Sequence, residues 1–150
     1  MVRGAYMEKE RARAEKLGYH DPINPSREAT DEMFNKGLAF CLENKQRINL
    51  VCGSHNERSN QYLTELMEKH GLDHRDQRVW FAQLLGMSDN ISFNLAKAGY
   101  NVAKYVPYGP VSAVMPYLLR RAAENTSVAG QSSRELSLIR RELKRRKSAK

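Results

Sequence analysis

The sequence predicts an α/β fold in which parallel strands alternate with helices. Four segments rich in apolar and β-branched residues are each followed by a segment with helical periodicity, and a further helix ends the 150-residue chain. This alternation favours right-handed β-α-β crossovers and a parallel sheet covered by helices. Four such units are half of an eight-fold barrel, or a small open doubly wound sheet. No glycine-rich phosphate fingerprint follows the first strand, which argues against the doubly wound sheet.

The first unit is expected within residues 2–44. A strand-like segment, "VRGAY", occupies residues 2–6, and a charged stretch and the loop "GYHDPINP" follow it. Ser26 is a plausible N-cap for a helix over residues 27–44. The apolar positions of this helix recur at spacings of three and four. They are Met33, Phe34, Gly37, Phe40 and Cys41.

The second unit begins with a buried strand, "INLVCGS", at residues 48–54. The amphipathic segment "HNERSNQYLTELMEKHG" follows as a helix, with Gly71 as its C-terminal cap. The side chains expected to face inward on this helix are Tyr62, Leu63, Leu66 and Met67. A strand followed by an amphipathic helix is the repeating unit of a parallel α/β fold.

Two more units complete the pattern. "RVWFAQLLG" is a strand, and a short helix follows it from Ser88 to Gly99. "NVAKYVPYG" is the last strand, and Pro110 stands at the first position of an apolar helix that carries Arg120 and Arg121. Pro116 is expected to kink this helix or to end its first turn. The final helix is expected over about residues 133–148.

The net charge of +8 does not by itself indicate a nucleic-acid binder. Residues 134–150 hold eight Lys or Arg and two Glu, so this tail carries +6 of the total. A basic tail of this kind is more often a solvated helix, and we find neither zinc-finger spacing nor an aromatic RNA-binding signature. Two cysteines favour a reduced compartment, and the sequence contains no apolar tract long enough to span a membrane.

The position of the first strand predicts that this chain is part of a longer domain. A parallel strand that is buried on both faces seldom begins at a free N-terminus, yet the first strand starts at residue 2. Four strands alone would also leave two open edges. We therefore expect the isolated chain to lack stable cofactor binding.

In a parallel α/β barrel, functional side chains lie at the carboxyl ends of the strands. Those positions hold the groups Arg3-Gly4-Ala5-Tyr6, Ser54-His55-Asn56, Leu84 with Gly86, and Tyr105 with its loop. They combine cationic, imidazole, small, aromatic and aliphatic groups, as in a pocket for a flat cofactor beside a small polar substrate. No metal cluster or paired-carboxylate set accompanies them. Structural alternatives remain open, with His55 as a helix cap and the arginine pair as solvated surface.

Several motifs together resemble the flavin-dependent proline dehydrogenases of the animal mitochondrial type. They are "VRGAY", "GYHDPINPS", "SHNE", "FAQLLGM" and "AGYNVAKYVPYGPV" with "PYLLRRAAEN". The resemblance runs from Val2 to about Glu142. It implies the C-terminal half of a distorted (βα)8 catalytic barrel, about four βα units over residues 1–128, followed by the basic terminal helix.

The resemblance also implies a role for individual residues. Arg120 and Arg121 would bind the proline carboxylate, since two guanidinium forks offer charge-assisted bidentate bonds. Tyr105 would pack on the substrate ring, with Leu84 and Tyr6 beside it. The residues implied to contact FAD are Arg3, Gly4, Ala5, Ser54, His55, Asn56 and Glu124.

The implied reaction is the FAD-dependent oxidation of L-proline to 1-pyrroline-5-carboxylate, with electrons passed to a quinone at the matrix side of the inner mitochondrial membrane. Nucleic acid is not an expected partner. Two alternatives remain open. A hydroxyproline dehydrogenase would typically have a smaller residue in place of Tyr105, and an inactive fragment would act through its basic tail on anions.

Overall fold

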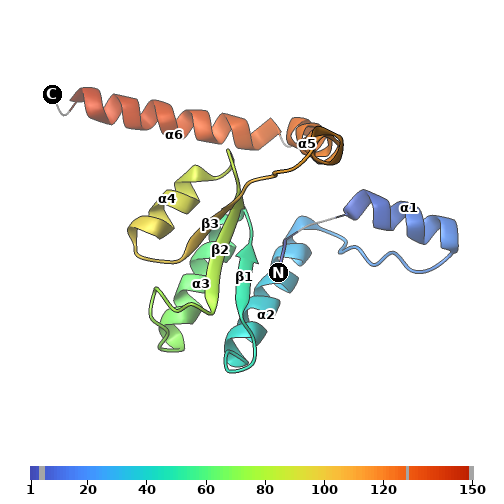
Figure 1. Ribbon diagram of the computed structural model, residues 1–150, viewed down its shortest axis with the longest axis horizontal. Helices are drawn as coiled ribbons and strands as arrows, with labels where there is room; N and C mark the ends of the chain where they lie inside the picture. The colour runs from blue at the N-terminus through green and yellow to red at the C-terminus, as the bar shows by residue number, and fades with distance from the viewer. Residues whose placement is uncertain (4–5, 128, 149–150) are drawn as a thin grey trace. The chain divides into compact units, whose positions relative to one another are not determined.

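The structure, a computed structural model, describes the backbone of residues 1–3, 6–127 and 129–148, and the side chains in these ranges except those of residues 120–135 and 138. The chain divides into two compact units, Met1–Tyr105 and Val106–Lys150. The elements in chain order are α1 (Met7–Leu17), α2 (Arg27–Glu43), β1 (Leu50–Gly53), α3 (Glu57–Lys69), β2 (Val79–Leu84), α4 (Asp89–Lys97), β3 (Val102–Tyr105), α5 (Val111–Ser127) and α6 (Ala129–Ser148) (Figure 1).

A parallel sheet forms the centre of the first unit. Within the described residues it has three strands in the order β1-β2-β3. Leu50 pairs with Val79 at the start of β1 and β2, and Phe81 pairs with Val102 at the start of β3. Helices α3 and α4 connect the strands as β-α-β crossovers. The alternation of strands and helices read from the sequence is therefore confirmed for these three strands.

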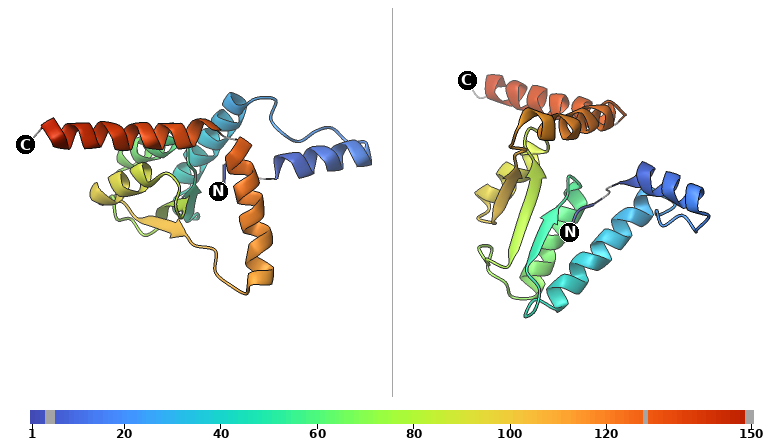
Figure 2. Two further views of the ribbon diagram at one scale, coloured as in Figure 1. Left: turned by 90° about the horizontal axis from the view of Figure 1, so that it is seen from above. Right: turned by 45° about the vertical axis from the view of Figure 1, so that its right-hand side comes forward.

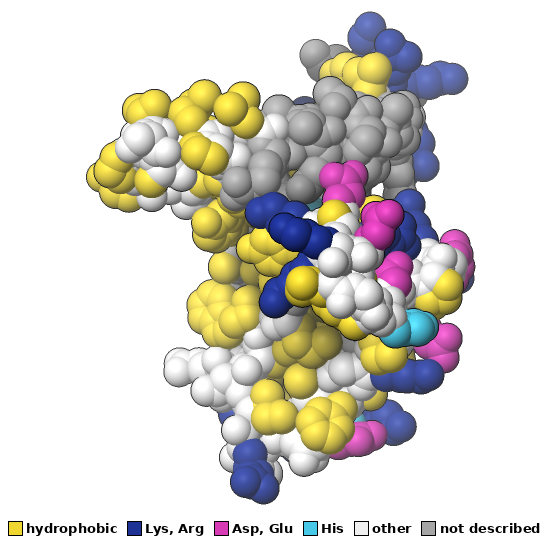
Figure 3. All heavy atoms as spheres, turned by 90° about the vertical axis from the view of Figure 1, so that its right-hand side faces the viewer, with side chains coloured by type: hydrophobic (Ala, Val, Ile, Leu, Met, Phe, Trp, Pro, Cys, Tyr) yellow, Lys and Arg dark blue, Asp and Glu magenta, His cyan; other side chains and the backbone are white. Residues whose placement is uncertain are grey.

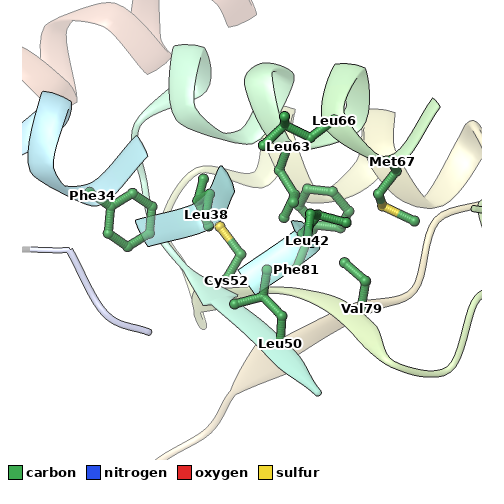
Figure 4. Close-up of a cluster of buried hydrophobic side chains, with 10 residues drawn as sticks. All are labelled: Phe34, Leu38, Leu42, Leu50, Cys52, Leu63, Leu66, Met67, Val79 and Phe81. Carbon is green, nitrogen blue, oxygen red and sulfur yellow. The ribbon is translucent and has the colours of Figure 1, made fainter. Parts of the chain in front are cut away.

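The hydrophobic core lies between one face of the sheet and helices α2 and α3. Figure 4 shows the side chains of the helices meeting those of β1 and β2, and both views of Figure 2 place the two helices on the same side of the sheet. The core residues are Phe34, Leu38, Leu42, Leu50, Cys52, Leu63, Leu66, Met67, Val79 and Phe81. The inward positions predicted for the helix after β1, which is α3, are confirmed, with Tyr62 partly buried at the edge of the core.

The opposite face of the sheet is exposed. Side chains alternate along each strand, so Val51 and Trp80, which are register partners, both point away from the core. They are 50% and 38% exposed. Figure 3 shows further hydrophobic side chains at the surface that it draws. Parallel strands are ordinarily covered on both faces, so this sheet is half covered within the described residues.

The predicted first strand is shorter than expected. Val2 forms a single parallel bridge with Gly53, and the Arg3 amide donates to the Gly53 carbonyl at 3.0 Å. The strand does not reach Tyr6, because Tyr6 has a left-handed backbone, with φ of 59°, directly before α1. Gly4 and Ala5 lie outside the described residues.

Helix α1 was not predicted, because its sequence lacks an apolar stripe. Only Ala14 is buried along "MEKERARAEKL". The helix is instead built from residues with high intrinsic helix propensity, and Glu8 and Glu10 occupy its first turn, where negative charge favours the helix dipole. Gly18 ends it with a φ of 71°.

Helix α2 begins as predicted, but it buries a partly different stripe. The Ser26 Oγ accepts a hydrogen bond from the Ala29 amide at 3.1 Å, which confirms the N-cap. Of the predicted apolar face, Phe34 is buried while Met33 and Phe40 are exposed. The buried positions follow Phe34 at intervals of four and are Leu38 and Leu42. The predicted face is therefore partly confirmed, since Cys41 is also partly buried against the core, but the buried stripe is centred on Leu38 and Leu42.

The second unit consists of α5 and α6. The Pro110 carbonyl accepts from the amides of Ala113 and Val114, so the proline directly precedes α5, and the helix continues through Pro116. Helix α6 starts at Ala129, earlier than predicted. Among the described residues, no helix is both long and apolar enough to cross a membrane.

Candidate functional site

Leu84 and Tyr105 lie side by side at the carboxyl ends of β2 and β3. They are register partners, and the Leu85 amide donates to the Tyr105 carbonyl at 3.0 Å, so the two strands stay paired to their ends. Register partners project from the same face of a parallel sheet. Tyr105 is 53% exposed there and Leu84 is half-buried. An aromatic and an aliphatic side chain thus share one surface, as the sequence predicted.

A row of small residues crosses the sheet next to this pair. Gly53, Ala82 and Ala103 are register partners on β1, β2 and β3. Ala82 and Ala103 stand two residues before Leu84 and Tyr105 on the same strands, so the row lies on the same face of the sheet as that pair. The small side chains of Ala82 and Ala103 leave the sheet surface low beside the pair, whereas Met1 and Val2 lie against Gly53.

The loop after β1 holds the predicted triplet Ser54, His55 and Asn56. The buried Ser54 Oγ accepts from the Asn56 amide at 3.1 Å. The Asn56 Oδ1 accepts from the amides of Arg58 and Ser59 at 2.9 and 3.3 Å, so Asn56 is the N-cap of α3. The side-chain oxygens of both residues therefore build the turn. His55 is half-buried, and its Nδ1 lies 2.9 Å from the Ser88 Oγ at the start of α4.

A buried polar network lies beneath this loop, and it was missed at the sequence level. The Gln83 Nε2 donates to the Ser54 carbonyl at 3.2 Å and to the Asn60 Oδ1 at 3.4 Å. The Asn60 Nδ2 donates to the carbonyls of Ser54 and Asn56 at 3.1 and 2.7 Å. The Ser92 Oγ donates to the Gln83 Oε1 at 2.9 Å. The available signal was Gln83, a polar residue in phase with Val79 and Phe81 on the core face of its strand.

Arg3 is held beside the end of β1. Its Nε donates to the Asp31 Oδ1 of α2, and both side chains are mostly buried, at 18% and 28% exposure. Asp31 was not among the predicted site residues. Tyr6 is 70% exposed, with the Lys9 Nζ 5.9 Å from its ring centroid. The structure therefore places Arg3 near the Ser54 loop and leaves Tyr6 at the surface.

The predicted anion-binding residues belong to the second unit. Arg120, Arg121 and Glu124 all lie on α5, but their side chains are outside the described residues. Helical spacing puts Glu124 one turn after the arginine pair, at intervals of four and three.

Neither cysteine is arranged for redox or metal chemistry. Cys41 and Cys52 are free thiols, and burial of Cys52 in the core raises the pKa of its thiol to about 12. In the part of the chain that the structure describes, no cluster of three His, Cys, Asp or Glu could hold a metal ion.

These features define a class of protein: a parallel α/β fold that carries polar and aromatic side chains where such folds bind cofactors, at the carboxyl ends of the strands. Residues 1–134 match the family described as "Proline dehydrogenase", and the chain belongs to that family. The family predicted from the sequence motifs is thus confirmed.

Individual relatives agree with this membership. "Proline dehydrogenase 1, mitochondrial" of Homo sapiens is 50% identical over an alignment of 149 residues, and the match covers 97% of this chain and 25% of the relative. "Hydroxyproline dehydrogenase" of Xenopus laevis is 47% identical over 150 residues, covering 97% of this chain and 32% of the relative. The chain thus spans about a quarter to a third of the length of these relatives.

A solved structure shows the same fold. Proline utilization A from Bdellovibrio bacteriovorus, inactivated by N-propargylglycine, superposes with a TM-score of 0.76 and 30% sequence identity. The match covers 88% of this chain and 14% of that protein. The parallel α/β architecture is therefore shared with a protein of known structure.

Proposed function

We propose that this chain forms the C-terminal part of the catalytic domain of an FAD-dependent proline dehydrogenase. The observation that carries the proposal is the pair Leu84 and Tyr105 at the ends of two adjacent parallel strands, in a chain that matches the family over residues 1–134. Active sites of parallel barrels lie at this edge of the sheet. The pair supplies the apolar walls for a small saturated ring.

The exposed sheet face supports the half-barrel part of the proposal. Val51 and Trp80 point away from the core and are open to solvent, whereas the inner face of an α/β barrel is packed with side chains from all its strands. Strands supplied by the rest of the domain would cover this face. In this arrangement the described sheet and α5 correspond to the later barrel strands and the last barrel helix, and α6 is the basic terminal helix.

The residues present fit a flavin. The small Ala82 and Ala103 would allow a flat ring system to approach β2 and β3 closely, and the half-buried His55 offers a polar group in the loop after β1. Arg3 adds a cationic group beside β1, and Gly4, Ala5 and Glu124 complete the proposed set of contacts. Ser54 and Asn56 would act through their loop, because their side-chain oxygens are already engaged in the turn and the helix cap.

In the proposed mechanism, Arg120 and Arg121 bind the substrate carboxylate and fix the direction of the ring. Tyr105 and Leu84 hold the ring and exclude water from it, with Tyr6 brought to the same pocket by the rest of the domain. FAD, where bound, would supply the redox chemistry as the acceptor of two electrons from the substrate ring. Proline loses two electrons and two protons to become 1-pyrroline-5-carboxylate, and a quinone takes both to become a quinol.

We place the intact enzyme in the mitochondrion, at the matrix side of the inner membrane, where a quinone acceptor is available. The human relative's printed name includes "mitochondrial". Hydroxyproline oxidation is the second candidate function, because the Xenopus hydroxyproline dehydrogenase is nearly as similar as the human proline dehydrogenase. The large Tyr105 favours proline, since a smaller residue there would make room for the extra hydroxyl.

The arginine pair provides the test. In a chimera, this chain replaces the matching segment of the human relative, and proline-dependent reduction of a quinone analogue is measured. Arg120→Lys and Arg121→Lys should each raise KM by roughly 10- to 100-fold, because Lys cannot form the bidentate bonds. The control is a second adjacent pair on α6, Arg140→Lys and Arg141→Lys, which should leave KM unchanged. Equal effects of both pairs would overturn the proposed carboxylate site.

A further inference from the structure

Ser88 has an unusual backbone for its position. It directly precedes α4 with φ of 52° and ψ of 43°, in the left-handed region that residues with a Cβ adopt rarely. A serine at a helix N-cap ordinarily has an extended backbone and accepts a bond from an amide of the first turn. The Ser88 side chain makes no such cap bond.

The Ser88 hydroxyl, which does not cap α4, contacts a residue on another loop instead. The Ser88 Oγ lies 2.9 Å from the Nδ1 of His55, thirty-three residues earlier and on the loop after another strand. Ser88 itself is buried, at 6% exposure, and His55 is half-buried. A strained residue that gives up its usual bond for a contact with an imidazole indicates a constraint other than helix stability.

Neighbouring groups hold Ser88 in this conformation. The Ser88 carbonyl accepts from the amides of Ile91 and Ser92 at 3.0 and 3.2 Å, and also from the Ser92 Oγ at 3.3 Å. Ser92 continues through Gln83 into the network beneath the His55 loop.

A lysine fixes the residues on either side of Ser88. The Lys104 Nζ donates to the Met87 carbonyl and to the Asp89 carboxylate, both at 2.7 Å. The backbone at Ser88 is therefore set by contacts to β2, β3 and α4 together.

We propose that Ser88 is a positioning residue that fixes the orientation of the His55 ring through its bond to Nδ1. The relevance of this ring to catalysis rests on the proposed contact of His55 with the flavin. A hydroxyl can donate to a ring nitrogen or accept from it, so the bond is compatible with either neutral tautomer and acts on the direction of the ring. Because both nitrogens belong to one rigid ring, fixing Nδ1 also fixes where Nε2 lies.

The test uses the full 150-residue chain without cofactor, labelled with ¹⁵N in its histidines. At a pH of about 8, above the ordinary imidazole pKa of about 6.5, the two ring nitrogens of each tautomer have distinct chemical shifts. Ser88→Ala removes the hydroxyl and keeps a Cβ, and Ser88→Gly removes it while relieving the strain at positive φ. Because glycine suits this backbone, the second variant keeps the test valid if the first folds poorly.

In the parent chain the His55 Nδ1 signal should carry the shift of a hydrogen-bonded ring nitrogen. In both variants this signal should shift, because the hydroxyl that bonds to Nδ1 is lost. The other three histidines are internal controls. His74 is the most useful of them, because its Nδ1 lies 2.9 Å from the Ala98 carbonyl and must be protonated to donate there. Unchanged His55 signals in Ser88→Gly would overturn the proposal, whether or not the flavin proposal holds.

Discussion

Leu84 and Tyr105 are register partners at the carboxyl ends of adjacent parallel strands, and both project from the sheet face opposite the hydrophobic core. The backbone pairing of β2 and β3 extends one residue beyond Leu84, because the Leu85 amide donates to the Tyr105 carbonyl. The strand positions, rather than the loops after them, therefore set the spacing of the aromatic and the aliphatic side chain. A site built on strands keeps its geometry better than one built on loops.

Truncation of Tyr105 should change substrate preference. In the chimera with the human relative, Tyr105→Ser is expected to lower kcat/KM for proline by roughly 10- to 100-fold, because a missing ring contact costs a few kcal/mol in the transition state. The ratio of hydroxyproline to proline oxidation should rise. Tyr19→Ser removes an exposed tyrosine outside the site and serves as the control. An unaltered ratio in Tyr105→Ser would argue against contact with the substrate ring.

The network beneath the His55 loop should contribute to stability. Gln83→Leu keeps the size of the side chain but removes the donor to the buried Asn60 Oδ1 and the nearer acceptor of the buried Ser92 Oγ. Unsatisfied buried polar groups destabilise by about 1–3 kcal/mol, which urea denaturation of the chain would detect. Gln77→Leu, at an exposed position, is the matched control and should change the unfolding free energy by less than about 0.5 kcal/mol. Equal effects at the two positions would contradict the role of the network.

Stability should fall in acid partly through Asp76. Hydrogen bonds from the Arg78 guanidinium, supported by the Arg78 amide, lower the pKa of this carboxyl to about 2. A depressed pKa means that the ionised form stabilises the fold above the unfolded-state value of about 4, and that this contribution is lost as the pH falls toward 2.

Arg78 is 37% exposed, so solvent screens part of its attraction to Asp76. We expect the ionised Asp76 carboxyl to contribute about 1 kcal/mol to the free energy of unfolding after this screening. Asp76→Asn should therefore lower the melting temperature at pH 7 and flatten its dependence between about pH 4 and 2. A variant that melts as the parent chain does across this range would show that the ion pair has no role in stability.

The two thiols should differ in reactivity. Cys52 is fully buried and the pKa of its thiol is raised to about 12, whereas Cys41 is partly exposed. A thiol reagent at neutral pH should therefore modify one cysteine rapidly, and Cys41→Ser should abolish the fast phase. The second thiol should react only when urea unfolds the chain, since the thiolate is the reactive form. Rapid modification of Cys52 in the folded chain would contradict the core packing.

The sequence predicted β1, β2, β3 and most helices because their periodicity reflects burial against the sheet, whereas the strand predicted at residues 2–6 is a single bridge at Val2. It missed α1, whose helix depends on intrinsic propensity and not on an apolar face. The predicted face of α2 was partly wrong, because Met33 and Phe40 are exposed although they are as hydrophobic as the buried residues. Periodicity identifies an apolar face, but only tertiary packing decides between two of them.

The site was predicted unevenly for a similar reason. Strand-end positions predicted that Leu84 and Tyr105 lie side by side, since this follows from the parallel topology, and their contact with a substrate stays a prediction. The links from Gln83 to Ser92 and from Ser88 to His55 join residues that are distant in the chain or on different elements, and no spacing rule connects them. Asp31 was missed likewise, because its partner Arg3 lies twenty-eight residues earlier.

The most direct measurement of the central claim is an anaerobic titration of the chimera with L-proline, followed by the absorbance of its bound flavin. A proline dehydrogenase should lose its oxidised-flavin absorbance as proline is added and regain it when a quinone analogue is supplied. The same protein carrying both Arg120→Lys and Arg121→Lys should need roughly 100-fold or more proline for the same loss. A folded, flavin-loaded chimera whose absorbance proline does not change would contradict the assignment.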